Sequence, residues 1–290
     1  MKICTVPGNT NENLTRENQI KALADAGFDG IDYSLFHYPI DSGIFTSSDD
    51  EFRAYFTHLG EYAESCGIAM NQVHSPMPSY TGDKEKDKYL LEIQKKSIIA
   101  AYYLKSKYII IHPCIPREYR YTHFRAECRE INFEFYNKLR PLLEKYQIKL
   151  CVENMFNWDP KLEKICPTVC SDAEEMIDYI DNLGRDVFCA CLDIGHSVLS
   201  GSGPKDMITK LGDRIETLHV HDNDGRNDYH LVPGLGRIDW DECVTALTDI
   251  GYKGMFSIEA GDFFHTFRNV PYEDSANYLY KICYGLVGNK

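Results

Sequence analysis

The chain has 290 residues, 43% of them hydrophobic, and we expect residues 1–290 to form one domain with a large core. Its 31 Lys and Arg residues are outnumbered by 44 Asp and Glu residues, and this net charge of −13 argues against a nucleic-acid partner, which normally needs a basic surface. No apolar run of 18 residues is present to cross a membrane, and eleven scattered cysteines without framework spacing are typical of a reduced, cytoplasmic protein.

Short β-rich runs alternate with amphipathic helical runs along the chain. We expect eight strands, which in chain order cover Lys2–Val6, Gly30–Phe36, Ile68–Ser75, Tyr108–Pro113, Ile148–Asn154, Phe188–Asp193, Ile215–Asp222 and Gly254–Ala260. Helix starts between them carry a capping side chain three residues ahead of an acid: Ser48 before Glu51, Ser171 before Glu174, and Asp239 before Glu242. Strands that alternate with helices pair in parallel.

Two helix-to-strand passages have nearly the same sequence. Residues 22–31 read Ala-Leu-Ala-Asp-Ala-Gly-Phe-Asp-Gly-Ile, and residues 246–255 read Ala-Leu-Thr-Asp-Ile-Gly-Tyr-Lys-Gly-Met. In each passage the first glycine, Gly27 or Gly251, suits the residue after a helix, where a positive φ is needed. A recurring βα unit, with eight strands in all, predicts a single (β/α)8 TIM barrel.

Ionisable residues gather at the C-terminal ends of these strands, where such a barrel builds its active site. They are His74, His112, Glu153, Asp193, His196, His219, His221 and Glu259. Any one of them alone is better explained by a hydrogen bond to a neighbouring loop, and only the set as a whole favours a shared site. Several charged groups converging on one mouth need a common partner, because a buried charge is costly unless it is compensated. The set therefore predicts a divalent cation.

The alternation of side chains along the strands supports this reading. Glu153 shares its strand face with Cys151, Asp193 shares its face with Cys191, and Glu259 shares its face with Ser257. If the acids point into the barrel, the side chains below them are small and leave room for a site.

The ordered motifs resemble the xylose-isomerase-like barrel superfamily, which includes sugar isomerases and epimerases and the endonuclease IV repair enzymes. The motifs lie at successive strand ends: Val152-Glu153-Asn154, Leu192-Asp193-Ile194-Gly195-His196, His219-Val220-His221-Asp222 and Ile258-Glu259-Ala260. By resemblance to the ketose epimerases, one divalent ion (Mn, Mg or Zn) would be bound by Glu153, Asp193, His221 and Glu259. It would polarise a substrate carbonyl and stabilise an enediolate.

The same resemblance implies catalytic roles. Glu153 and Glu259 would act as base and acid on the two faces of the substrate, and His196 would hold a substrate oxygen. The function implied is that of a metal-dependent isomerase or epimerase of a small carbohydrate or related hydroxy-carbonyl compound. A dehydratase that uses the same enediolate stays open, as does association into a homo-oligomer.

An alternative arises because all nine ligands of the three zinc ions of endonuclease IV have counterparts here. Beyond the residues above, this implies a role for His74, His112, Asp228 and His230 as additional metal ligands or substrate contacts. A multi-zinc phosphodiesterase acting on abasic DNA is therefore the second hypothesis. A barrel that binds metal or sugar without catalysis is the third, and the presence of both glutamates argues against it.

The surroundings of these ligands favour the isomerase reading. Residues 155–158, Met-Phe-Asn-Trp, resemble an apolar lid over a small substrate, and the Pro-Gly-x-Gly-x-Ile-Asp-Trp run at residues 233–240 resembles the epimerase branch. Trp158 and Arg226 are candidate substrate contacts. The acidic net charge points in the same direction.

Overall fold

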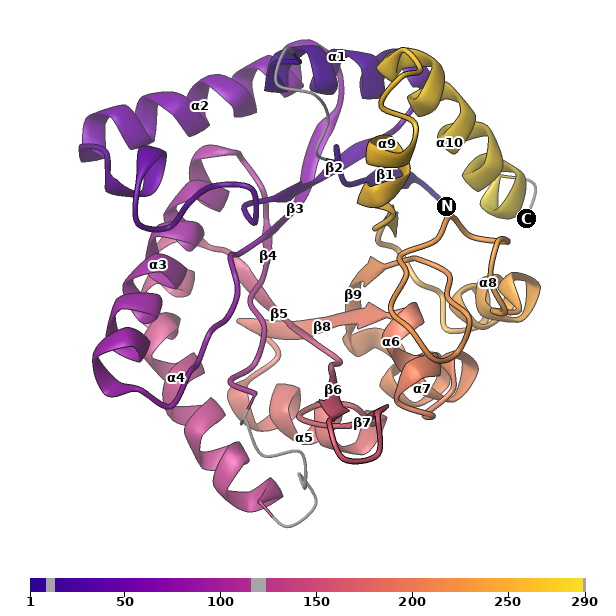
Figure 1. Ribbon diagram of the computed structural model, residues 1–290. Helices are drawn as coiled ribbons and strands as arrows, with labels where there is room; N and C mark the ends of the chain where they lie inside the picture. Colours follow the sequence, from indigo (N-terminus) through magenta and orange to yellow (C-terminus); the bar gives the residue numbers. More distant parts are fainter. Residues whose placement is uncertain (9–13, 116–123, 289–290) are drawn as a thin grey trace.

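The computed structural model describes residues 1–8, 14–115 and 124–288 (Figure 1). Eight parallel strands form a barrel: β1 (Ile3–Thr5), β2 (Gly30–Ser34), β3 (Ala69–His74), β4 (Tyr108–Ile110), β5 (Lys149–Glu153), β8 (Phe188–Asp193), β9 (Ile215–His219) and β10 (Phe256–Ile258). Neighbours follow chain order from β1 to β9, and β10 pairs with β1. A parallel bridge between Val220 and Ile258 closes the ring. The predicted (β/α)8 fold is confirmed.

Helices surround the strands as the outer layer of the barrel (Figure 1). They are α1 (Arg16–Ala26), α2 (Asp49–Ser65), α3 (Lys84–Tyr103), α4 (Arg125–Tyr146), α5 (Ala173–Leu183), α7 (Pro204–Leu211), α8 (Trp240–Asp249) and α10 (Tyr272–Val287). Shorter segments lie in the loops: η1 (Gly43–Thr46), α6 (Ile194–Leu199), η3 (Gly212–Arg214) and α9 (Gly261–Thr266). Helices α1 and α10 pack together, which joins the two ends of the chain.

Local capping chemistry sets where several helices begin and end. Ser48 and Glu51 form a reciprocal capping box at the start of α2, and Asp239 accepts a hydrogen bond from the Glu242 amide at the start of α8. The expected cap at Ser171 is wrong by one residue. Asp172 is the N-cap of α5 instead, because its carboxylate accepts a hydrogen bond from the backbone N–H three residues later.

The two repeated glycines end helices as predicted. Gly27 follows α1 with φ of +104°, and Gly251 follows α8 with φ of +70°. Only a residue without a side chain adopts this left-handed conformation at no steric cost. Each glycine turns the chain from the outer layer back toward the next strand.

The barrel interior is filled by small side chains beneath the mouth. Cys151, Cys189 and Cys191 form a buried cluster with Ile110, and the sulfurs of Cys151 and Cys189 lie 3.4 Å apart. The inward direction of this face, expected from side-chain alternation, is confirmed by this cluster. Small cysteines leave the space above them to the acids at the strand ends.

A hairpin follows β5 that the sequence analysis did not anticipate. Its strands β6 (Phe156–Asp159) and β7 (Lys164–Pro167) pair antiparallel and form a sheet separate from the barrel. Of residues 155–158, read as an apolar lid, all but Met155 form part of the first strand of this hairpin. The Phe156 ring packs edge-on against His196, whereas Trp158 is 49% exposed.

Among the described residues, no helix is long and apolar enough to span a membrane.

Candidate metal centre

Strand ends place a ring of ligand-type side chains at one mouth of the barrel. His74, Glu153, Asp193 and His219 each end a strand, His112 lies two residues beyond β4, and Glu259 directly follows β10. Parallel strands all point their C-terminal ends to the same side, so these residues meet although they are far apart in sequence.

Three acids and one histidine form the first group. Glu153, Asp193, His219 and Glu259 offer ligand atoms that all lie within 4.8 Å of one another. His219 Nδ1 is 2.8 Å from a Glu153 carboxylate oxygen and 3.4 Å from a Glu259 carboxylate oxygen. Apart from Glu259, which is 14% exposed at its side chain, these side chains are almost completely buried.

The histidine in this group is His219, whereas the sequence analysis selected His221. Both side chains lie on the same face of β9 and its extension, so alternation cannot separate them. The register between β8 and β9 distinguishes the two histidines, because Asp193 is the Cα partner of His219. His221 lies beyond that level, with its Nε2 3.1 Å from Asp193 Oδ1 and 3.6 Å from Asp228 Oδ1.

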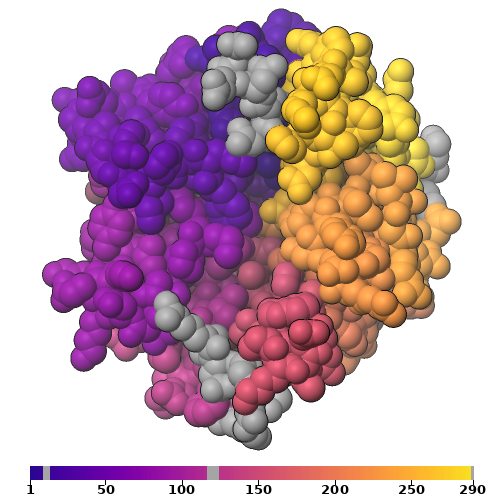
Figure 2. All heavy atoms as spheres, in the orientation of Figure 1, coloured from indigo at the N-terminus to yellow at the C-terminus, as the bar shows by residue number. Residues whose placement is uncertain are grey.

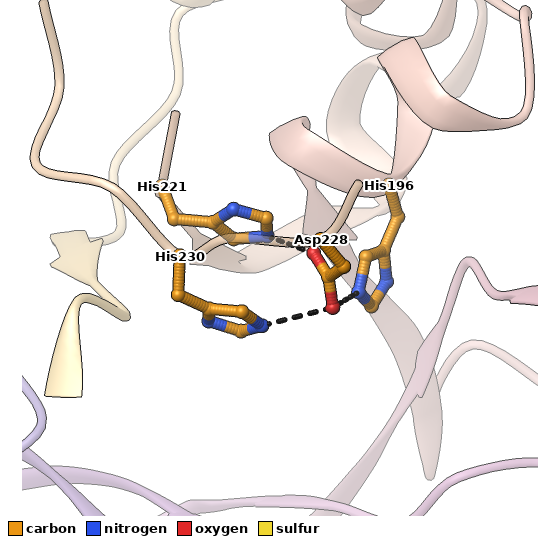
Figure 3. A group of neighbouring side chains, drawn as sticks. All are labelled: His196, His221, Asp228 and His230. Atoms are coloured by element: carbon orange, nitrogen blue, oxygen red, sulfur yellow. Dashed lines mark hydrogen bonds and ion pairs between the residues drawn. The ribbon is translucent and has the colours of Figure 1, made fainter. Parts of the chain in front are cut away.

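A second group therefore forms around Asp228 (Figure 3). His196, His221 and His230 direct their Nε2 atoms at its carboxylate, at distances of 3.7, 3.6 and 3.1 Å. The rings of His221 and His230 stack with their centroids 4.0 Å apart. Asp228 Oδ1 and His221 Nδ1 are buried and make no hydrogen bond within the described part of the chain.

Backbone contacts aim two of these imidazoles. Asp193 begins α6 and accepts a hydrogen bond from the His196 amide at 2.7 Å. The Nδ1–H of His196 donates to the Asn154 carbonyl, and the Nδ1–H of His230 donates to the Glu259 carbonyl. With Nδ1 occupied in both rings, Nε2 is the nitrogen left to face Asp228 or a cation.

A third group, His74, His112 and Glu153, gathers at the other carboxylate oxygen of Glu153, and its His74 also lies 3.6 Å from Glu259 Oε1. His112 Nε2 is 2.9 Å from Glu153 Oε2 and 2.9 Å from His74 Nε2. The Phe36 ring covers both imidazoles, with centroids 4.5 Å from His74 and 6.0 Å from His112. Glu153 is thus shared between this group and the first, as an acid that bridges two adjacent cation positions would be.

Electrostatics in the first and third groups keep Glu153 and Glu259 ionised. Burial alone would raise the pKa of Glu153 and Glu259, but the charge of His219 and of neighbouring imidazoles outweighs it and lowers both. Burial also lowers the pKa of His112. Carboxylates that stay ionised together in so small a volume favour a cation among them.

The second group shows the same competition between burial and charge. Burial opposes protonation of His196 and His230, yet Asp193 and Asp228 outweigh it and raise both pKa values to about 10. The pKa of Asp228 is lowered, although burial opposes this, by hydrogen bonds from His196 and His230. Without a metal ion, these imidazoles therefore hold protons where an ion would otherwise bind.

A pocket of about 490 Å³ opens beside Glu259 and His230. Its other walls include Phe36, Asp262 and His265, none of which the sequence analysis singled out. Figure 2 shows the surface hollowed near its centre, between the indigo and purple segments and the yellow and orange ones. The loops after β2 and β10 are thus brought to the same opening.

Trp158 and Arg226 lie outside the residues that line this pocket. Trp158 is on the β6–β7 hairpin, and the Arg226 amide donates to Asp224 within an exposed loop after β9. Phe36 and Asp262 could have been found from their places after the second and eighth strands. Neither carried a motif that distinguishes it from an ordinary loop residue.

Comparisons with known proteins place this geometry in context. The family model for the xylose isomerase-like TIM barrel matches residues 20–282. An inosose isomerase of Bacillus licheniformis is 21% identical over 269 residues, which cover 89% of this chain and 88% of that protein. A D-psicose 3-epimerase of Enterocloster bolteae is 34% identical over 91 residues, 31% of this chain and 29% of that protein.

An uncharacterized protein of Methanocaldococcus jannaschii is 30% identical over 194 residues. That match covers 64% of this chain and 63% of the archaeal protein, so the chain spans less than two thirds of this relative and of the D-psicose 3-epimerase.

Solved structures share the whole architecture. The IOLI protein with a zinc atom superposes with a TM-score of 0.78 at 19% identity, covering 99% of this chain and 98% of that one. A D-psicose 3-epimerase crystallised in the presence of D-fructose superposes with a TM-score of 0.74 at 19% identity, covering 100% of both chains. At this identity the likeness establishes the fold.

Proposed function

We propose a function on the premise that the chain belongs to the xylose isomerase-like TIM barrel family, whose model matches residues 20–282. The proposed function is that of a divalent-metal-dependent isomerase or epimerase of a small sugar or related hydroxy-carbonyl compound. The relatives named as inosose isomerase and D-psicose 3-epimerase support this class. They do not favour the phosphodiesterase alternative, and neither does the net charge of −13.

The group of Glu153, Asp193, His219 and Glu259 is the observation that carries the proposal. Three carboxylates and one imidazole suit a hard or borderline divalent ion such as Mn²⁺, Mg²⁺ or Zn²⁺. The fit is supported by Glu153 Oε2, which is buried and completes no hydrogen bond with any described residue, although His112 Nε2 lies 2.9 Å away. We therefore propose His219 as the imidazole ligand of this ion, instead of His221, whose Nε2 also lies 3.1 Å from Asp193 Oδ1.

When bound, the ion would supply Lewis-acid polarisation of a substrate carbonyl. Glu259 faces the pocket and is ionised, so its carboxylate is free to accept the proton from the carbon next to that carbonyl. Glu153 lies buried behind Glu259 and is ionised, so it can act as the acid on the opposite face only after it has received a proton, for which His112, with Nε2 2.9 Å from Glu153 Oε2, is the neighbouring donor. Delivery of that proton to the opposite face inverts the stereocentre, and Glu259 releases the proton that it took to solvent through the pocket. If the proton is instead delivered to the former carbonyl carbon, the product is an isomer in which the carbonyl has changed place. His196 would hold a substrate oxygen.

The remaining ligand-type residues extend the site on both sides. We assign His196, His221, Asp228 and His230 to a second cation position, because Asp228 Oδ1 is buried there without a hydrogen bond from the part of the chain that the structure describes. His74 and His112 would complete a third position with Glu153. With one ion only, the same side chains would bind substrate oxygens.

Trp158 and Arg226 are proposed as contacts at the rim of the mouth. An exposed tryptophan on a hairpin can stack on the apolar face of a sugar ring, and the long side chain of an arginine can reach a substrate oxygen. Their contribution would appear in KM more than in kcat, because neither touches the acids that move the proton.

The test combines metal analysis with a hydrogen-exchange assay. Purified protein, stripped with chelator and reloaded with Mn²⁺, Mg²⁺ or Zn²⁺, is first measured for ions per chain. Candidate ketoses and inososes are then incubated with it in D₂O, and loss of the exchanging C–H signal is followed by NMR. Exchange at the carbon beside the carbonyl is expected even where little product accumulates.

Two results would contradict the proposal. Failure to retain any of these ions after reloading would remove the metal site. Retention of metal without exchange for a broad panel of sugars, together with cleavage of abasic duplex DNA, would replace the isomerase by the phosphodiesterase.

A further inference from the structure

Both ring nitrogens of His219 have acidic neighbours. Nδ1 faces the mouth, where it lies 2.8 Å from Glu153 Oε1 and 3.4 Å from Glu259 Oε2. Nε2 faces down into the barrel, where it lies 3.1 Å from Oδ2 of Asp32 and completes no hydrogen bond among the described residues. His219 and Asp32 are both completely buried. The imidazole therefore links the acids at the mouth to a carboxylate one layer below.

Asp32 is itself held firmly in position. It lies in β2, and its Oδ2 accepts hydrogen bonds from Gln72 Nε2 at 2.7 Å and from Ser257 Oγ at 3.1 Å. The Gln72 amide cannot turn over freely, because its oxygen accepts from Asn71 and its nitrogen also donates to a backbone carbonyl. Three strands thus fix the oxygen that faces His219.

Asp32 does not touch the pocket. It is absent from the pocket lining, and the groups of three or more ligand-type residues found among the described residues do not include it. A direct role in binding substrate or metal is therefore not what this geometry offers. Its contact with the first group runs through the imidazole of His219.

We propose that Asp32 is a positioning residue that holds the Nε2–H of His219, so that Nδ1 is the nitrogen offered to the cation. This inference rests on the proposed metal site. A neutral imidazole carries one N–H, and a carboxylate that binds it at Nε2 leaves the Nδ1 lone pair free. The negative charge of Asp32 also makes the imidazole a better donor, as carboxylate partners of metal-bound histidines do elsewhere.

The Asp32→Asn variant tests this with little change in shape. Binding of Zn²⁺ or Co²⁺ is followed by competition with a chromophoric chelator, and the step that His219→Ala removes is assigned to this site. Asp32→Asn is expected to weaken that step by about 10- to 100-fold and to leave any other step unchanged. Cys189→Ala, a change in the same interior that touches neither residue, is the control and should bind like the wild type.

The tautomer of His219 gives a second readout that needs only wild-type protein. Long-range ¹H–¹⁵N NMR of the zinc-loaded chain should show a proton on Nε2 and none on Nδ1. The opposite tautomer would overturn the inference. So would an unchanged step in Asp32→Asn, or an equal loss in every step, which would indicate general structural damage. A wild type that binds no ion would instead refute the proposed function.

Discussion

Asp193 and His219 stand directly opposite each other across the ladder between β8 and β9. This pairing puts the aspartate and the histidine at one position of the ladder, whereas Glu153 is the Cα partner of Cys191, two residues before Asp193. His221, two residues after His219, therefore lies next to Asp228, and the Nε2 atom of His221 is also 3.1 Å from Asp193 Oδ1. Asp193 is therefore the carboxylate that joins the first and second groups.

The two histidines of β9 and its extension should separate in a pair of alanine variants. His219→Ala is expected to lose the ion between Glu153 and Glu259, because it removes one of four ligands. His221→Ala should retain that ion and disturb only the neighbourhood of Asp228. Anomalous difference maps of Mn²⁺-loaded crystals locate the ions directly. An ion that survives in His219→Ala and is lost in His221→Ala would restore the ligand set inferred from sequence.

Glu259→Gln should abolish most turnover without unfolding the barrel. The change keeps the size of the side chain but removes its ability to accept a proton, and general-base contributions are typically about 10²- to 10⁴-fold. The rate of C–H exchange in D₂O measures the loss, and thermal unfolding checks the fold. Glu216→Gln is the matched control, since Glu216 pairs with Lys149 and lines a different cavity, away from Glu259. Equal rates in the two variants would exclude a role for Glu259.

Gly195→Ala should disturb the second group through packing alone. A Cβ there would come within 2.0 Å of the His221 ring, which is itself buried, so the ring must move. A cost of about 1–3 kcal/mol in unfolding free energy is expected, measured by urea denaturation. Gly285→Ala, on the exposed side of α10 with nothing within 4 Å of the new Cβ, should be neutral or slightly stabilising. Equal stability of the two variants would show that His221 is not fixed where it stands.

Stability of the metal-free protein should fall as the pH rises from about 6.5 to 10. The folded pKa values of His196 and His230 are raised to about 10, whereas an unfolded histidine titrates near 6.5. The folded state thus binds more protons across this window, and the stabilisation present below it is lost as the pH passes through the folded pKa. The melting temperature of chelator-treated protein measures the decline.

The Asp228→Asn variant supplies the control for this pH effect. Removing the carboxylate that raises the pKa of His230 should flatten the slope of melting temperature against pH. A metal-free wild type whose melting temperature stays constant or rises over the same range would contradict the assignment.

Much of the fold could be predicted from short-range patterns in the sequence. Eight strands, the caps at Ser48 and Asp239, and the helix-ending glycines Gly27 and Gly251 were all predicted, because each depends on residues a few positions apart. The β6–β7 hairpin was not predicted. Its short strands lack clear alternation, and only pairing with each other defines them.

The sequence by itself determined which types of side chain stand at the strand ends, because period-two alternation and the order of βα units fix the mouth of a barrel. The tertiary structure decided how those side chains divide into groups. The division of His219 and His221 between two groups, the sharing of Glu153 and Asp193, and the contact of Asp32 with His219 depend on how far each strand is shifted against its neighbour. That shift is set by packing around the whole ring, and no single strand encodes it.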